Sequence, residues 1–153
     1  MTGTFSASDP DGLSDTSTFT ITVNPINDAP VIPGVLGDQT TDEDVTLTIS
    51  AADLTALLGS SLDVDNLNSE LATELEITDA SGTVLFTQAI DLTNISDISF
   101  TPPQDFFGNL TGTFSASDPD GLSDTSAFAI TVNPINDAPV SYTHLTLPTI
   151  YSV

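Results

Sequence analysis

The residues whose spacing could do chemistry are aspartates in the segment SDPDGLSDT, which occurs twice, at 8–16 and 117–125. In the first copy, Asp9, Asp11 and Asp15 have the spacing of part of a calcium loop, in which carboxylates alternate with other residues. The same segment also encodes a tight turn, because Pro presets the second turn position and Gly accepts a positive φ. Taken alone, the segment indicates a turn that closes a hairpin rather than a calcium loop.

The charge of the chain favours a cation as its partner. The sequence has no Lys or Arg but 22 Asp and Glu, which gives a formal charge of −22. This composition excludes a phosphate-neutralising surface, and therefore nucleic-acid binding, and it disfavours adhesion to anionic membranes. Because no basic side chain can balance the acids, metal ions are the expected counter-charges. A cysteine-free set of oxygen ligands favours calcium.

The usual catalytic residues are nearly absent from the sequence. It contains no Cys, Lys or Arg, and its single histidine is His144, near the carboxyl terminus. Nucleophilic catalysis needs an activating partner, usually His or Lys. A pair of carboxylates could hydrolyse glycosides, but nothing distinguishes one pair among so many acids. We therefore expect no enzymatic activity.

The sequence contains an internal repeat of domain length. Residues 2–31 and 111–140 align without a gap, and both copies end in the octapeptide NPINDAPV. The copies differ at two positions, Thr18/Ala127 and Thr20/Ala129. A separation of 109 residues predicts whole domains in tandem rather than a solenoid.

The repeat also predicts the domain boundaries. Residues 32–139 are expected to form one complete module, and residues 1–31 the carboxyl-terminal part of a preceding module with its linker. Met1 aligns with Leu110, inside a strand of the complete module, so we expect the chain to begin within a domain.

Residues 140–153 differ in composition from the rest of the chain. They contain both tyrosines, Tyr142 and Tyr151, together with His144. The string VSYTHLTLPT resembles a transposase-type sequencing adapter translated in frame. We therefore expect a non-native tail here; the alternative is the opening strand of a third module.

Alternating apolar residues predict short strands throughout the chain. In STFTITVN (17–24), Phe19, Ile21 and Val23 share one face and threonines share the other, as in a half-buried antiparallel strand. Similar patterns predict strands at 45–50, 71–77, 83–86, 97–100 and 111–117. The residues expected to point inward from two of these strands are Val45, Leu47, Ile49, Leu71, Thr73, Leu75 and Ile77.

One segment breaks the alternation and predicts a short helix within 50–59. Leu54, Leu57 and Leu58 have helical spacing, with Ser50 as the N-cap and Gly59 as the C-cap. The sum of elements indicates an all-β Greek-key sandwich. Its large apolar core residues are expected to be Phe100, Phe106, Phe107, Phe114 and Phe128.

Together, these residues resemble the cadherin-like tandem repeats of giant bacterial surface adhesins. The motifs that carry the resemblance are TDEDVTLTISAADL, LDVDN, ISFTPPQDFFG, FSASDPDG and TITVNPINDAPV. NDAP after an alternating strand is the most specific of them. The resemblance covers residues 1–140, with the full pattern over 32–139. It implies Ig-like/cadherin-like sandwiches strung end to end, with calcium bound at the junctions between modules.

The resemblance also implies a set of calcium ligands. These would be Asn27 and Asp28 from the linker, Glu43 from the TDEDV turn, Asp63 and Asp65 from LDVDN, and Asp118 from the end of the sixth predicted strand. The sequence departs from eukaryotic cadherins, which carry an acid at the position of Asn24 and one more residue between Asn-Asp and Pro. The second junction, at Asn136 and Asp137, lacks its downstream half. The alternative interpretation of all these acids is a solvated rim.

The expected function is to extend and stiffen the stalk of an extracellular bacterial adhesin, helped by calcium. The expected partners are neighbouring repeats of the same chain and a cell-surface or matrix ligand. No apolar run approaches the roughly 18 residues of a membrane span, so membrane insertion is not expected. Two rivals stay open: a metal-free spacer of the same fold, and a ligand-binding module, for example for carbohydrate, in a secreted enzyme. The absence of Trp removes the usual platform for stacking sugars.

Overall fold

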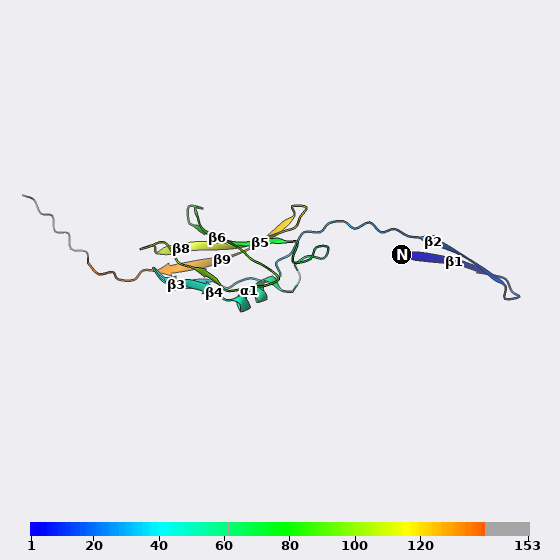
Figure 1. The fold of residues 1–153 in the computed structure, drawn as a ribbon, viewed down its shortest axis with the longest axis horizontal. Helices are drawn as coiled ribbons and strands as arrows, with labels where there is room; N and C mark the ends of the chain where they lie inside the picture. The colour runs from blue at the N-terminus through cyan, green and yellow to red at the C-terminus, as the bar shows by residue number, and fades with distance from the viewer. Residues whose placement is uncertain (61, 140–153) are drawn as a thin grey trace, which may run out of the picture.

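The computed structural model describes residues 1–60 and 62–139, so the expected tail at 140–153 lies outside the described residues. The described residues form a hairpin, an extended linker and a β-sandwich (Figure 1). The strands are β1 (Thr2–Ser8), β2 (Ser14–Thr20), β3 (Gln39–Asp42), β4 (Leu47–Ile49), β5 (Ala72–Asp79), β6 (Val84–Ala89), β7 (Ile98–Phe100), β8 (Gly108–Ser117) and β9 (Ser123–Asn133), and the helix is α1 (Ala51–Leu58).

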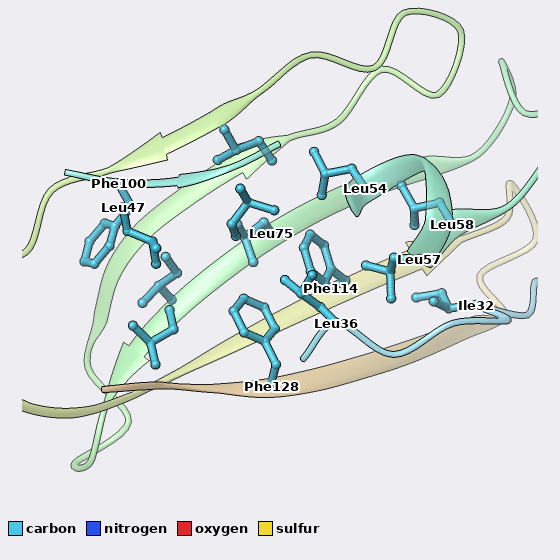
Figure 2. Packing of buried hydrophobic residues seen from close by; sticks show 14 of the residues in the cluster. Ile32, Leu36, Leu47, Leu54, Leu57, Leu58, Leu75, Phe100, Phe114 and Phe128 are labelled. Carbon is cyan, nitrogen blue, oxygen red and sulfur yellow. The ribbon is translucent and has the colours of Figure 1, made fainter. Parts of the chain in front are cut away.

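A five-stranded sheet forms one layer of the sandwich, with the strand order β3-β9-β8-β5-β6. All neighbours in this sheet are antiparallel except β3 and β9, which run parallel. The antiparallel pair β4-β7 and helix α1 cover the inner face of the sheet (Figure 2). The predicted all-β sandwich is therefore confirmed.

Apolar side chains from both layers meet in a single core. Figure 2 shows Leu75, Phe114 and Phe128 of the sheet facing Leu47 and Phe100 of the β4-β7 pair. The two rings of the sheet, Phe114 and Phe128, stack with their centroids 5.5 Å apart. Burial of each such side chain stabilises the fold by about 1.5–3 kcal/mol.

Helix α1 forms where the sequence predicted it, with both predicted caps. The Ser50 hydroxyl accepts the N–H of Asp53, and Gly59 ends the helix with a φ of 67°. Leu54, Leu57 and Leu58 are all buried, since their spacing places them on one face of the helix. The helix therefore closes one end of the core.

Two residues that were predicted to lie in the core do not. The side chain of Phe107 is 62% exposed and that of Val45 is 46% exposed. Phe106, the neighbour of Phe107, packs against the core, and adjacent residues in extended chain point to opposite sides. Val45 precedes β4 and lies in the turn after Asp42, outside the alternating strand.

Strand β3 was not predicted, because the sequence QTTD contains no apolar alternation. It forms because it pairs with β9 from Gln39↔Ile130 to Asp42↔Asn133. This pairing extends β9 to Asn133, which is the first residue of the second copy of the octapeptide. The parallel direction also carries residues 42–44 to the end of the sandwich where β9 finishes.

The hairpin β1-β2 stands apart from the sandwich at the far end of the linker (Figure 1). All seven residues of β2 are exposed. The apolar face of the hairpin is uncovered, with Phe5 68% and Phe19 54% exposed. Beyond the strand pairing, the N–H of Ile21 donates to the carbonyl of Met1.

Candidate functional site

The candidate ligands lie at the two opposite ends of the sandwich. We call the end reached by the linker the proximal end; it comprises residues 27–32, 62–66 and 118–124. We call the end where β9 finishes the distal end; it comprises residues 42–44, Asp105 and 133–137. The linker and the end of β9 extend from opposite ends of the sandwich in Figure 1.

Linker side chains and backbone bind the proximal end directly. The side-chain amide of Asn27 donates to Oδ2 of Asp118 at 2.6 Å, and the N–H of Asp28 donates to Oδ2 of Asp65 at 2.9 Å. The structure therefore brings together four of the predicted ligands through direct hydrogen bonds. Asp63 completes this group, because it lies in the same loop as Asp65.

Two more hydrogen bonds hold the end of the linker. The N–H of Val31 donates to the carbonyl of Leu62 at 2.7 Å, and the N–H of Ile32 donates to Oδ2 of Asp124 at 2.8 Å. The side chain of Pro30, just before these two residues, is fully buried. Residues 27–32 are thus part of the sandwich surface rather than a free connection.

The loop LDVDN is shaped by its first aspartate. Oδ1 of Asp63 accepts the N–H groups of Asp65 at 2.7 Å and Asn66 at 3.0 Å, which is an Asx turn. The Asp63 side chain is 7% exposed. This turn aims the Asp65 carboxylate at the linker.

The DPDG segment forms the turn predicted from its sequence. Oδ1 of Asp118 accepts the N–H of Leu122 at 2.8 Å, and Gly121 has a φ of 92°. The hydrogen bond from Asn27 lowers the pKa of Asp118, and backbone N–H donors in the turn add to this effect, whereas burial opposes it. In the first copy of the turn, Asp9 likewise accepts the N–H of Leu13.

Glu43 lies at the distal end and not with the other five predicted ligands. Its carboxylate accepts the N–H of Ile135 in a short hydrogen bond, and its own N–H donates to the carbonyl of Asn133 at 2.9 Å. The side chain is 3% exposed. The Asn133 amide also donates to Asp42 at 3.1 Å. The TDED turn therefore binds the start of the second octapeptide.

An acidic trio also lies at the distal end; of its members, only Asp137 belonged to a junction expected from the sequence. Asp44, Asp105 and Asp137 each offer a carboxylate oxygen, and these oxygens lie within 4.8 Å of one another. Asp44 and Asp105 have φ values of 61° and 57°, the left-handed conformation that Asp tolerates better than most residues. Their only signal in the sequence was membership of the motifs TDEDV and PPQDFFG.

Comparison with known proteins identifies the family of this sandwich. Residues 27–131 match the sequence model of the family described as bacterial Ig domain. The chain belongs to the bacterial Ig domain family. Domains of this family are typically found outside the cell or on its surface, which indicates an extracellular structural module.

The match of the bacterial Ig domain starts at Asn27, the first linker residue that binds the proximal end. A solved structure similar to this chain is that of CopC from Methylosinus trichosporium OB3b, with a TM-score of 0.40, 12% sequence identity, and coverage of 67% of this chain and 89% of CopC. No curated protein sequence matches the chain. Within residues 1–60 and 62–139, no helix is long and apolar enough to cross a membrane.

The two ends of the Ig domain supply the oxygen ligands that hard cations prefer. Calcium takes six to eight oxygens from carboxylates, amide and backbone carbonyls, and water. The acidic trio offers three carboxylates at one point of the distal end. The proximal end offers Asp63, Asp65 and Asp118, already oriented by turns and by the linker. Each end therefore presents three carboxylates to a neighbouring module.

Proposed function

We propose that this Ig domain is a spacer repeat in the stalk of a large extracellular bacterial adhesin, and that calcium binds where successive modules meet. One observation carries the proposal. The chain reaches and leaves the sandwich at opposite ends, and it does so through the same octapeptide, at 24–31 and 133–140. Units joined in this way extend a chain in one direction rather than fold back on it.

The dimensions of the domain suit a spacer. Strand β9 has 11 residues and runs along the sandwich to the distal end. At a rise of about 3.3 Å per residue, it spans about 36 Å. Each further repeat would add at least this length to the stalk, and its partners would be the repeats before and after it. The role needs no catalysis, in line with the missing catalytic side chains.

Calcium would be shared between the two halves of each junction. In a tandem array, the distal end of one module meets the proximal end of the next, so the acidic trio would face the following copies of Asp63, Asp65 and Asp118. In each junction, Glu43 would belong to the preceding module, where its carboxylate accepts the N–H of Ile135. Carboxylates brought together in this way repel one another, and a divalent ion replaces the repulsion by attraction. At a free concentration 100 times Kd, one site adds about 2.7 kcal/mol to the folded state.

The proposal can be tested on the chain lengthened by one internal repeat, residues 1–140 followed by residues 32–153, which contains a complete junction. Isothermal titration should find calcium binding with a Kd of about 10⁻⁴–10⁻³ M, the range of extracellular modules, and weaker binding of magnesium. The thermal midpoint should rise with calcium. Small-angle scattering should give an elongated particle.

Matched variants separate the junction from the rest of the acidic surface. Changing Asp44, Asp105 and Asp137 of the first module to Asn should abolish the calcium response. Changing Asp79, Asp91 and Asp97 to Asn removes the same charge elsewhere and should leave the response intact. If the array binds no calcium, the metal-free spacer is the better interpretation. A compact particle in solution would exclude the role as an extended stalk.

A further inference from the structure

The octapeptide NPINDAPV occurs twice in the chain, and each occurrence shows a different half of its contacts. The first occurrence binds the sandwich that follows it, through Asn27, Asp28 and Val31. The second occurrence binds the sandwich that precedes it, through Asn133 and Ile135. Because the sequences are identical, each linker of a tandem array has both sets of groups.

The two sets of contacts do not compete. The preceding sandwich is bound by the first and third positions of the octapeptide, Asn133 and Ile135. The following sandwich is bound by the fourth, fifth and eighth positions, at Asn27, Asp28 and Val31. The two sets of hydrogen bonds therefore use different groups of the octapeptide, although the Asp137 carboxylate at the fifth position also lies beside Asp44 and Asp105 of the preceding sandwich.

The linker also has little freedom of its own. Proline occupies its second and seventh positions, which fixes φ there and restricts the residue before each proline to extended conformations. Pro30, at the seventh position, is fully buried against the following sandwich. The third position of the octapeptide binds the preceding sandwich and the fourth binds the following one. Only one peptide bond, between Ile135 and Asn136 in the second copy, therefore separates the two sets of contacts.

The groups that hold the linker are costly to release. Glu43 is 3% exposed and Asp118 is 6% exposed, so each carboxylate depends on its hydrogen-bond donors for the solvation that burial removed. The linker donates the N–H of Ile135 to Glu43 and the side-chain amide of Asn27 to Asp118, which also accepts the N–H of Leu122 from its own turn. Bonds between a charged group and a neutral donor are among the stronger hydrogen bonds in proteins.

We infer that the octapeptide is a two-sided clip that fixes the angle between successive Ig domains by direct hydrogen bonds and does not need a metal ion to do so. Its preceding partner is the TDED turn at the distal end of one copy, and its following partner is the proximal end of the next copy. The inference rests on the tandem array of the proposed function but not on calcium. Calcium adds to a junction that is already oriented.

The experiment uses the lengthened chain of residues 1–140 followed by residues 32–153. The sequence has no cysteine, so Thr87→Cys in both modules places one spin label on an exposed position of each. Pulsed dipolar spectroscopy in a calcium chelator should give one narrow distance distribution. A freely flexible linker of eight residues would instead spread its ends over about 16 Å.

Variants of the clip provide the contrast. Asn136→Ala in the first module removes the donor that would reach the next copy of Asp118, and Glu43→Ala in the first module removes the acceptor for Ile135. Both should broaden the distribution toward the flexible limit. Asn27→Ala is the matched control, because it changes the same octapeptide position before the first module. Glu43→Gln keeps a carbonyl acceptor and should stay narrow, even though it removes a charge.

Each outcome decides between the two ideas. A distribution that is broad in chelator and narrows only with calcium overturns the clip and leaves the calcium junction standing. A narrow distribution in chelator, broadened by Asn136→Ala, supports the clip whether or not calcium binds. A narrow distribution that Asn136→Ala does not change shows that something other than the octapeptide orients the modules. If Glu43→Ala fails to fold, Asn136→Ala and Glu43→Gln still decide.

Discussion

The two hairpins of this chain have nearly the same sequence and very different surroundings. In β1-β2, Thr2 pairs with Thr20, and in β8-β9 the equivalent Thr111 pairs with Ala129, so the register is the same. Phe19 is nevertheless 54% exposed, whereas its equivalent, Phe128, is 5% exposed. The local sequence therefore determines the turn and the pairing, and the neighbouring strands determine burial.

The neighbours also determine where the strands end. Strand β2 finishes at Thr20, whereas β9 continues for four residues past the equivalent position, to Asn133. The extra length is the part of β9 that pairs with β3. Each difference between the hairpins can be tested with a pair of equivalent variants or probes, which act as each other's control.

Amide exchange should show the largest contrast. Ile130 is buried and lies on β9, which is paired on both sides, with β3 and β8. Its amide should therefore exchange only on global unfolding, which costs at least about 5 kcal/mol in a typical domain. Among the described residues, the N–H of Ile21 is bonded only to Met1, at the end of an exposed hairpin, and an isolated hairpin is marginally stable in water. It should exchange near its intrinsic rate. Strong protection of Ile21 in a monomeric sample, checked by dilution, would contradict this view.

Truncation of the equivalent phenylalanines should show the next largest effect. Phe128→Ala removes a buried ring that stacks on Phe114 and should destabilise the sandwich by about 3–5 kcal/mol. Phe19→Ala should leave the sandwich within about 0.5 kcal/mol of the parent, because the ring is outside its core. Denaturant unfolding measures both. Equal effects would mean that the first hairpin packs on the sandwich in solution.

Alanine at the equivalent glycines should show a smaller contrast. Gly112 lies directly under the ring of its cross-strand partner Phe128, and a Cβ there would collide with that ring. Since the ring is fixed in the core, Gly112→Ala should cost about 1–3 kcal/mol. Gly3 has the same relation to Phe19, but that ring can swing into solvent, so Gly3→Ala should have little effect. If Gly112→Ala does not change the free energy of unfolding, the Phe128 ring can move to accommodate the added Cβ.

The smallest predicted effect concerns the equivalent turns. Asp118 and Asp9 both accept a turn N–H, but among the described residues only Asp118 also accepts a linker amide, from Asn27. Asn27→Ala should therefore raise the pKa of Asp118 toward its ordinary value of 3.8. The pKa of Asp79, lowered chiefly by the Ser81 hydroxyl, should not change.

The sign of the pH effect follows from this direction of shift. Because the folded pKa of Asp118 is lowered, its contribution to stability is present above about pH 3.8 and is lost as the pH falls through the lower folded value. The stability difference between the parent and Asn27→Ala should therefore shrink in acid. NMR titration of the side-chain carboxyls gives the pKa values. A difference that grows in acid would show that Asn27 acts through another group.

The sequence predicted the elements that are determined by interactions between neighbouring residues. The caps of α1, the DPDG turn and the alternation of β9 depend on residues next to one another, and the structure contains all three. It did not predict β3, because the residues that make QTTD a strand are in β9, about ninety positions away. Phe107 was placed in the core because its type is apolar, but its direction depends on the backbone.

The sequence named acids at both ends of the sandwich but did not predict how they are arranged. Five of the six predicted ligands come together at the proximal end, because the linker and two turns converge there. Glu43 was assigned to the same junction, but the parallel course of β3 places it at the distal end. Asp105 was missed, since nothing in its sequence neighbourhood indicates the approach of Asp44 and Asp137.

The parallel pair β3-β9 has a mechanical consequence. The first strand of the sandwich and its last strand lie side by side, and the chain continues from them toward opposite ends. Tension along the stalk would therefore pull β3 and β9 past each other along their length, and it would load their hydrogen bonds together rather than one after another. Resistance to such a pull is governed by the rate of unfolding rather than by equilibrium stability. Once the contacts of residues 27–32 are broken, the four residues of β3 would carry the load between the first and last strands of the domain.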